Sequence, residues 1–225
     1  MHHDAESGRP ARDQTGHLIG GVPIEFPERA RQRHRRGPLF GYRTAQRYPL
    51  PVPAQPHSER IAVYDSAGRV IGAADRATVY RDGLWHASAG VLVRSGDGER
   101  IYVHRRTETK MVFAGMHDCL AGGVVDPGED PADTATRELA EELGIVAETP
   151  PLPLASASWD GEWLGKPMRC HLFAYELRYD GPIRHQPEEI ADGWWWTEQR
   201  LRAHLADPDW PFVPDTRVLI PEMFT

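Results

Sequence analysis

The chain has 225 residues, of which 40% are hydrophobic and 26% are charged, a composition typical of a folded globular protein. No run approaches the roughly 18 apolar residues of a membrane span, and the opening MHHDAESGRP lacks the apolar stretch of a secretory signal. The two cysteines, Cys119 and Cys170, form neither a disulfide framework nor a metal-ligand pattern, so we expect a cytoplasmic location.

Residues 1–56 differ in composition from the rest of the chain. They are rich in Pro, Gly, Arg and His, show no periodicity, and carry nine Arg against five acids, a balance of +4. Because the whole chain has a net charge of −7, residues 57–225 carry −11. This acidic balance argues against general nucleic-acid binding and suits a domain that gathers divalent cations. We expect an irregular N-terminal extension over 1–56 and one folded domain over 57–225.

From residue 57 onward, short runs of apolar residues predict a series of strands and helices. In chain order the prediction is two strands around a turn at 65–68, a short helix or turn over 76–83, a hairpin formed by 87–95 and 100–107, a strand over 116–125, a helix over 131–143, strands over 170–179 and 193–197, and a helix over 198–207. Segment 155–169, with Trp159 and Trp163, is interpreted as a loop that shapes specificity. Strands on both sides of helices predict a layered α/β sandwich.

The helix predicted over 131–143 has signals at both ends. Asp130 is a candidate N-cap, Pro131 suits the first helical position, and Gly144 follows the last turn, where a left-handed residue is favoured. At about 100° per residue, one face of this helix carries three acids: Glu138, Glu141 and Glu142. Arg137 lies four residues before Glu141, so the two side chains can form an ion pair.

A glycine pair, Gly122 and Gly123, precedes this helix and leaves a backbone carbonyl free. Hard cations such as Mg²⁺ take oxygen ligands from carboxylates, carbonyls and water, and usually keep a substrate phosphate among their ligands. The acidic face and the Gly122 carbonyl together therefore predict a divalent-metal site rather than a solvated acidic surface.

The stretch GVVDPGEDPADTATRELAEELGI, residues 123–145, resembles the Nudix box. Its fixed positions are filled by Gly123, Glu129, Arg137, Glu138, Glu141, Glu142 and Gly144, with Leu139 and Ile145 at the apolar positions. The resemblance implies a Nudix-type α/β/α sandwich with a mixed sheet, and a pyrophosphohydrolase that uses Mg²⁺ or Mn²⁺. Its substrate would be a nucleoside diphosphate derivative or another small organic diphosphate. A homodimer is a possible assembly.

The same resemblance implies roles for individual residues. Glu138 and Glu142, with Glu141 and the Gly122 carbonyl, would hold the cations, so that water is oriented for in-line attack on phosphorus. Arg137, together with Glu129, would fix the geometry of the loop and the helix rather than touch the substrate.

From about residue 59 onward, the chain is also similar to isopentenyl-diphosphate isomerases and the Nudix hydrolases related to them. The similarity rests on GLWHAS (83–88), HRRTETK (104–110), PEEI (187–190) and WPFVPD (210–215). It implies that Lys110 binds the diphosphate together with Arg105 or Arg106, because successive strand residues face opposite ways and both arginines cannot point inward. Glu189 is the candidate general base, and Glu188 is the second choice.

Two alternative functions stay open, an isomerase-like enzyme and a non-catalytic diphosphate-binding module. The isomerases have a catalytic Cys immediately before the first Gly of the box and a metal-binding His immediately after it, where this chain has Gly122 and Val124. Cys119 lies three residues too early to replace that thiol. His86 matches one isomerase ligand, but an isolated His is more often structural. The complete acidic box argues against a module without catalysis.

Overall fold

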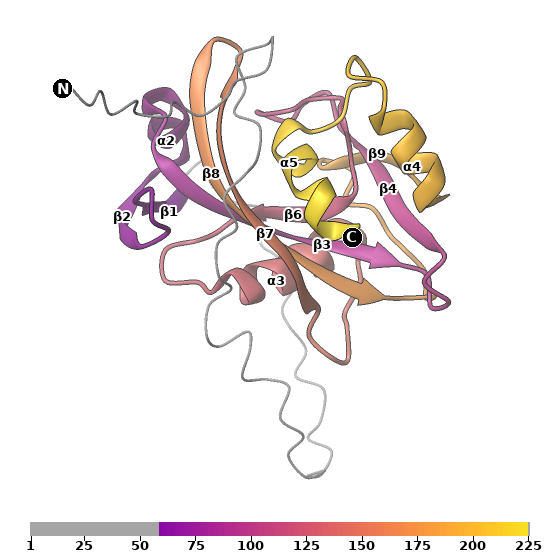
Figure 1. Ribbon diagram of the computed structural model, residues 1–225. Helices are drawn as coiled ribbons and strands as arrows, with labels where there is room; N and C mark the ends of the chain where they lie inside the picture. The colour runs from indigo at the N-terminus through magenta and orange to yellow at the C-terminus, as the bar shows by residue number, and fades with distance from the viewer. Residues whose placement is uncertain (1–58, 225) are drawn as a thin grey trace, which may run out of the picture.

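The described part of the chain opens with a hairpin and a short helix. A computed structural model describes residues 59–224, so the extension expected over 1–56 lies outside the described residues. β1 (Arg60–Tyr64) pairs antiparallel with β2 (Val70–Asp75), and α2 (Arg76–Asp82) follows directly (Figure 1). These elements match the predicted pair of strands and the predicted short helix.

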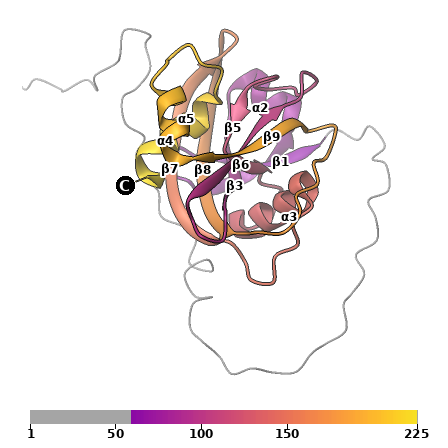
Figure 2. The same ribbon diagram turned by 90° about the vertical axis from the view of Figure 1, so that its right-hand side faces the viewer.

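The central strand of the main sheet is β3 (Trp85–Arg94). It runs parallel to β8 (Lys166–Arg178) on one side and antiparallel to β6 (Leu120–Val124) on the other. β7 (Leu152–Trp163) pairs antiparallel with β8, so the sheet is mixed. The long β7–β8 hairpin curves along one side of the molecule in Figures 1 and 2.

A second group of strands extends from the hairpin that follows β3. β4 (Arg100–Arg106) pairs antiparallel with β9 (Ile190–Thr197), and its end pairs with β5 (His117–Asp118). β3 and β4 are registered only at Arg94 and Ile101. The two strands therefore separate beyond their hairpin, and β6 takes the place of β4 beside β3.

The predicted acidic helix is α3 (Pro131–Leu143), which has the bounds expected from the sequence. The Asp130 side chain accepts a hydrogen bond from the backbone N of Ala132 at 2.9 Å, and Gly144 ends the helix with a φ of 64°. Leu139 and Leu143 are fully buried between α3 and the strands β3 and β6. Figure 1 shows α3 on one side of the sheet.

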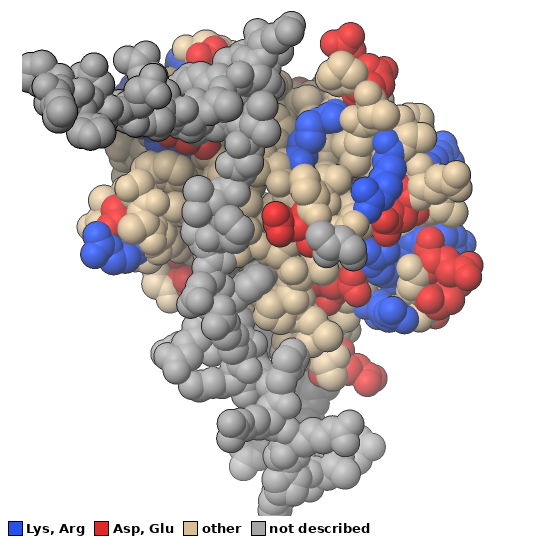
Figure 3. All heavy atoms as spheres, viewed as in Figure 1, with Lys and Arg blue, Asp and Glu red and all other residues tan. Residues whose placement is uncertain are grey.

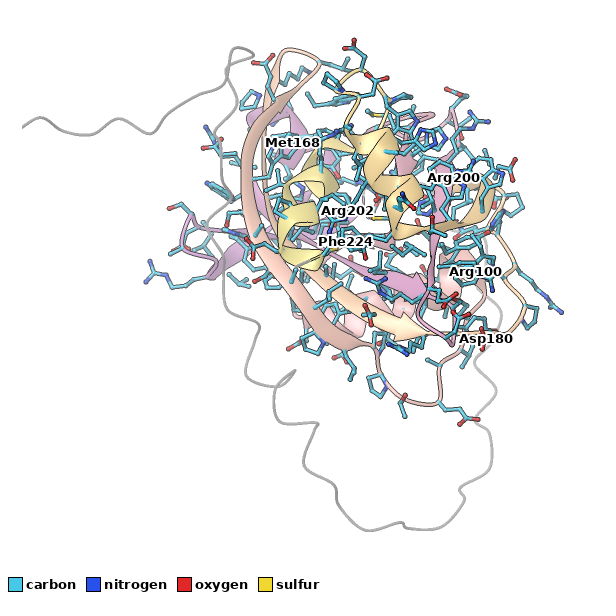
Figure 4. The ribbon with its side chains drawn as sticks, turned by 45° about the vertical axis from the view of Figure 1, so that its right-hand side comes forward. Arg100, Met168, Asp180, Arg200, Arg202 and Phe224 are labelled. Atoms are coloured by element: carbon cyan, nitrogen blue, oxygen red, sulfur yellow. The ribbon has the colours of Figure 1, made fainter. Side chains whose placement is uncertain are left out.

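The other side of the sheet is covered by the C-terminal helices. α4 (Glu198–Leu205) matches the prediction, whereas α5 (Pro214–Met223) was not predicted. α5 packs on β7 and β8, and Leu219 is fully buried there. Figure 4 shows Arg202 of α4 beside Phe224 at the end of α5, where the guanidinium carbon lies 5.3 Å from the ring centroid. Helices on both faces of a mixed sheet make this the expected α/β/α sandwich.

Two predictions about strands were wrong. The strand expected over 116–125 is divided into β5 and β6, because Asp118 turns its carboxylate back to the backbone N of Cys119 and Leu120 at 2.7 and 3.1 Å. The loop expected over 155–169 is instead the hairpin of β7 and β8, which turns at Leu164 and Gly165.

Two hydrophobic clusters fill the spaces between the layers. One lies between the sheet and α3, and the other lies between the sheet and the C-terminal helices. Cys119 and Cys170 are buried in the second cluster, where burial raises the pKa of both thiols. Trp159 belongs to this cluster and Trp163 packs against it. On the face shown in Figure 3, basic and acidic side chains are interspersed. No helix within residues 59–224 has the length and apolar character needed to cross a membrane.

Candidate active site

One cavity, of about 270 Å³, joins the box to distant parts of the chain. Its walls come from β3, β6 and α3, with further residues from α2, from the segment after β4 and from α5. The predicted site residues that line it are Arg106, Lys110, Gly122, Arg137, Glu138, Glu141 and Glu189.

The three acids expected to share one face of α3 differ in burial. Glu142 is only 3% exposed, and one of its carboxylate oxygens accepts a hydrogen bond from the backbone N of Gly122 at 3.0 Å. Burial, followed by the charge of Glu138, raises the pKa of Glu142 to about 8. Burial also raises the pKa of Glu138, although Arg137 opposes this effect. The Glu141 side chain, in contrast, is 51% exposed.

Arg137 connects the loop to the helix. Its Nε and Nη2 donate to the two carboxylate oxygens of Glu129 at 3.1 and 3.0 Å. Its Nη1 donates to Glu138 at 2.6 Å and to Glu141 at 3.3 Å, so the ion pair expected between Arg137 and Glu141 is present. One guanidinium group therefore holds carboxylates from both sides of the N-terminus of α3.

The glycine pair brings the backbone of β6 close to these acids. A Cβ atom added at Gly123 would lie 2.4 Å from a carboxylate oxygen of Glu138, so only glycine leaves room for that side chain. A Cβ atom added at Gly122 would lie 2.3 Å from the carbonyl oxygen of Ala89 and 2.4 Å from the Cα of Gly90. The box acids consequently lie directly against the backbone that was expected to provide a carbonyl ligand.

The basic residues of the HRRTETK segment separate as alternation requires. Arg106 and Lys110 line the cavity, whereas Arg105 lies outside it and pairs with Glu108 at 2.9 Å. Of the two arginines that were left as alternatives, the structure thus brings Arg106, and not Arg105, to the box. Burial lowers the pKa of Lys110 to about 8, and the charge of Arg106 acts in the same direction.

Glu189, the candidate base, lines the cavity and forms an ion pair with Lys110. Glu188 is exposed and does not line the cavity, and its backbone carbonyl accepts a hydrogen bond from the Thr107 hydroxyl at 2.8 Å. The cavity therefore includes Glu189, the first choice for the general base, and does not include Glu188, the second choice.

Sequence reasoning missed several residues of the cavity. Asp118 and Asp215 line it, and burial raises their pKa values to about 6 and about 7. Asp118 could have been noticed as an acid within an otherwise apolar run, and Asp215 ends the WPFVPD motif. Arg76 of α2 is a fourth Arg or Lys residue of the cavity, besides Arg106, Lys110 and Arg137, and the sequence carries no evident signal for it.

His86 also lines the cavity, but its environment is that of a structural residue. It is 4% exposed, its Nδ1 lies 3.4 Å from the carbonyl oxygen of Leu84, and its ring packs edge-on to Tyr80. Burial lowers the pKa of His86 to about 4, so the ring is neutral near pH 7. The structural role expected for this residue agrees with its surroundings.

The acids of α3 suit a divalent cation, although no preformed ligand cluster is found. Within residues 59–224, no three His, Cys, Asp or Glu side chains are arranged to hold a metal, because Glu138 is turned to Arg137 and Glu142 to Gly122. The charge of Glu138 nevertheless raises the pKa of the buried Glu142, so the two carboxylates form an unfavourable pair of like charges. Oxygen donors in such a pair are the ligands that Mg²⁺ and Mn²⁺ prefer.

Comparison with known families agrees with the geometry of the box. Residues 84–216, more than half of the chain, match the model of the NUDIX domain. The chain belongs to the Nudix hydrolase family. It is accordingly an enzyme of the pyrophosphohydrolase type, and members of this family generally use divalent metals.

Related Nudix hydrolases share most of their length with this chain. It is 65% identical to the Nudix hydrolase orf19 of Rhodococcus erythropolis, over 76% of this chain and 95% of the relative. It is 38% identical to the Nudix hydrolase SCO1686 of Streptomyces coelicolor, over 70% of this chain and 83% of the relative. The crystal structure of DR0079 from Deinococcus radiodurans superposes with a TM-score of 0.61 and 25% identity, covering 74% of this chain and all of that one. None of these names states a substrate.

Proposed function

We propose that this Nudix hydrolase cleaves the diphosphate linkage of a nucleoside diphosphate derivative or another small organic diphosphate, with Mg²⁺ or Mn²⁺ as the cofactor. The observation that carries the proposal is the joining of two opposite charge groups in one cavity. Glu138 and Glu141 of α3 line the cavity, with the buried Glu142 next to Glu138, and Arg106 and Lys110 reach the same cavity from the end of β4 and the segment after it. Charge of both signs is what a complex of metal and diphosphate requires.

The residues of the chain have distinct parts in this proposal. Glu138 and Glu142, with Glu141 and the Gly122 carbonyl, would hold the metal. A bound Mg²⁺ or Mn²⁺ supplies charge neutralisation at the diphosphate and makes water more acidic. Arg137 positions the acids through its bonds to Glu129 and Glu138, and the N–H of Gly122 orients Glu142.

Lys110 and Arg106 would bind the phosphate oxygens, and Glu189 would accept the proton of the attacking water. In the ligand-free protein Lys110 is paired with Glu189, so the carboxylate is occupied by the ammonium group. A phosphate oxygen competes with Glu189 for the Lys110 ammonium group. Substrate binding would therefore release the base at the moment when it is needed.

Two features of the structure argue against the isomerase-like alternative. The position of the isomerase thiol is Gly122, and a side chain there would collide with the backbone at Ala89 and Gly90. Cys119 is 1% exposed and does not line the cavity. A simple binding module would have no use for the buried, mutually repelling acids of α3, because their burial lowers stability.

A hydrolysis screen, in which the phosphate-ester products are separated and quantified by liquid chromatography, tests the proposal. The substrates are nucleoside diphosphate sugars, dinucleoside polyphosphates, coenzyme A derivatives and isoprenoid diphosphates, each with Mg²⁺ and with Mn²⁺, and the control enzyme is Glu142→Gln. We expect metal-dependent cleavage of at least one class, and loss of that activity in the variant. Conversion of isopentenyl diphosphate to dimethylallyl diphosphate would establish the isomerase instead, and a folded protein inactive on every class would refute both enzymatic readings.

A further inference from the structure

Arg76, the first residue of α2, is held firmly at the wall of the cavity. Its backbone N donates to the carbonyl oxygen of Glu59 at 2.8 Å. Its Nη1 donates to both carboxylate oxygens of Glu59, at 3.1 and 2.8 Å, and its Nε donates to the hydroxyl of Tyr80 at 3.2 Å. The guanidinium carbon lies 5.5 Å from the centre of the Tyr80 ring. Position and orientation of this side chain are thus set by two neighbours that also line the cavity.

These bonds leave part of the Arg76 guanidinium unused. Its Nη2 makes no hydrogen bond to any residue within 59–224, and the side chain is 22% exposed. A guanidinium group carries five N–H donors in a rigid planar fork that suits phosphate oxygens. The donors of Nη2 are consequently available to a ligand in the cavity that Arg76 lines.

Arg76 also acts on the other cations of the cavity. Its charge contributes to the lowering of the pKa of Lys110, after burial and Arg106, and it contributes in the same direction at His86. Arg76, from α2, is in mutual repulsion with Arg106 and Lys110, from the end of β4 and the segment after it; Glu59 offsets this repulsion at Arg76 and Glu189 offsets it at Lys110. An anion bound among the three would relieve it.

We propose that Arg76 binds a phosphate group of the substrate and forms, with Arg106 and Lys110, a three-cation clamp. The inference rests on the proposed function and adds a third phosphate-binding side chain to it. Three positive groups match a diphosphate, which carries two or more negative charges near neutral pH, better than they match a singly charged phosphodiester. Arg76 is a substrate-binding residue in this view, and Glu59 and Tyr80 are its positioning residues.

The experiment is a calorimetric titration of the full chain with methylene diphosphonate, a non-hydrolysable diphosphate, in the presence of Mg²⁺. Wild type is compared with Arg76→Gln and with Arg81→Gln, a matched control. Arg81 lies on the same helix and is also held by a carboxylate, but it is 63% exposed, pairs with Asp82 and does not line the cavity. Loss of one charge-assisted contact predicts a dissociation constant raised about tenfold or more in Arg76→Gln, and unchanged in Arg81→Gln.

The outcomes separate this inference from the proposed function. Tight binding by wild type and equally tight binding by folded Arg76→Gln would overturn the clamp and leave the proposed function intact. Absence of binding by wild type would overturn the proposed function, and the clamp with it. If Arg76→Gln does not fold, Arg76→Lys is measured in its place, because lysine keeps the positive charge and an aliphatic chain that can lie over Tyr80. One ammonium group cannot hold Glu59 and a phosphate in the planar geometry of a guanidinium. We expect at least about threefold weaker binding, and wild-type affinity would overturn the clamp.

Discussion

Replacement of Glu142 by Gln should stabilise the metal-free protein and, at the same time, remove most of its activity. In the metal-free fold the carboxylate is 3% exposed and lies near Glu138, and its pKa rises from an ordinary 4.5 to about 8. A rise of this size corresponds to an upper limit on the order of 5 kcal/mol at alkaline pH. Gln has nearly the same shape and no charge, so it avoids this cost.

The difference in the free energy of unfolding between Glu142→Gln and wild type should depend on pH. Because the folded-state pKa of Glu142 is raised, the folded protein retains the proton longer than the unfolded chain does. The carboxyl group therefore causes no penalty below about pH 4.5, and stability is lost as the pH rises through about 8. The free-energy difference between Glu142→Gln and wild type should accordingly widen between pH 6.5 and pH 9. Asp118 and Asp215 titrate in both proteins, so they cancel in this difference.

Urea unfolding in EDTA, measured at several pH values, tests this prediction. Glu141→Gln is the control, because that side chain is 51% exposed and its loss should change stability little. Addition of Mg²⁺ should then stabilise wild type more than Glu142→Gln, since only wild type keeps the buried charge for the metal. Activity on a confirmed substrate should fall on the order of 10²-fold or more in the variant. A constant stability difference across the pH range, or a variant less stable than wild type at pH 9, would refute the reasoning.

Three further predictions concern other parts of the chain. Arg106→Gln should raise KM about tenfold in steady-state assays, whereas Arg105→Gln should leave KM unchanged; equal effects would mean that the two arginines do not face opposite ways. Cys119→Ala should keep hydrolysis intact and lower the free energy of unfolding by about 1 kcal/mol or more, and an inactive but folded variant would reopen thiol chemistry. A chain of residues 57–225 should keep kcat within roughly tenfold while KM rises; a collapse of kcat alone would show that the missing residues take part in the chemical step.

The acidic helix could be predicted to the residue because all its signals are local. Asp130 caps it, Pro131 starts it and Gly144 ends it, and each signal lies within a turn of its partner. The different burial of Glu141 and Glu142 could not be predicted in the same way. Both lie on the acidic face, and only the packing of β6 decides that Glu142 is covered and Glu141 is not.

The elements that were missed are those whose signals depend on distant partners. The middle of β7, residues 155–158, consists of alternating Ala and Ser, because α5 packs on this strand and leaves room only for small side chains such as Ala155 and Ala157. α5 in turn contains Pro221, a residue that normally indicates the end of a helix. For the same reason Arg76 and Asp215 could not be placed at the site, since about 140 residues separate them in the sequence.

The bonding pattern of Arg137 divides the enzyme into a reactive part and an adaptable part. Within the described residues its carboxylate partners are Asp126, Glu129, Glu138 and Glu141, so these four acids are held together by one short segment of the chain. Apolar residues that line the cavity from β8 and α5, such as Met168 and Leu219, come from later parts of the chain and would meet the organic portion of a substrate. Substitutions of those residues can change the accepted compound while the bond-breaking apparatus stays intact, so a substrate switch by engineering should begin there.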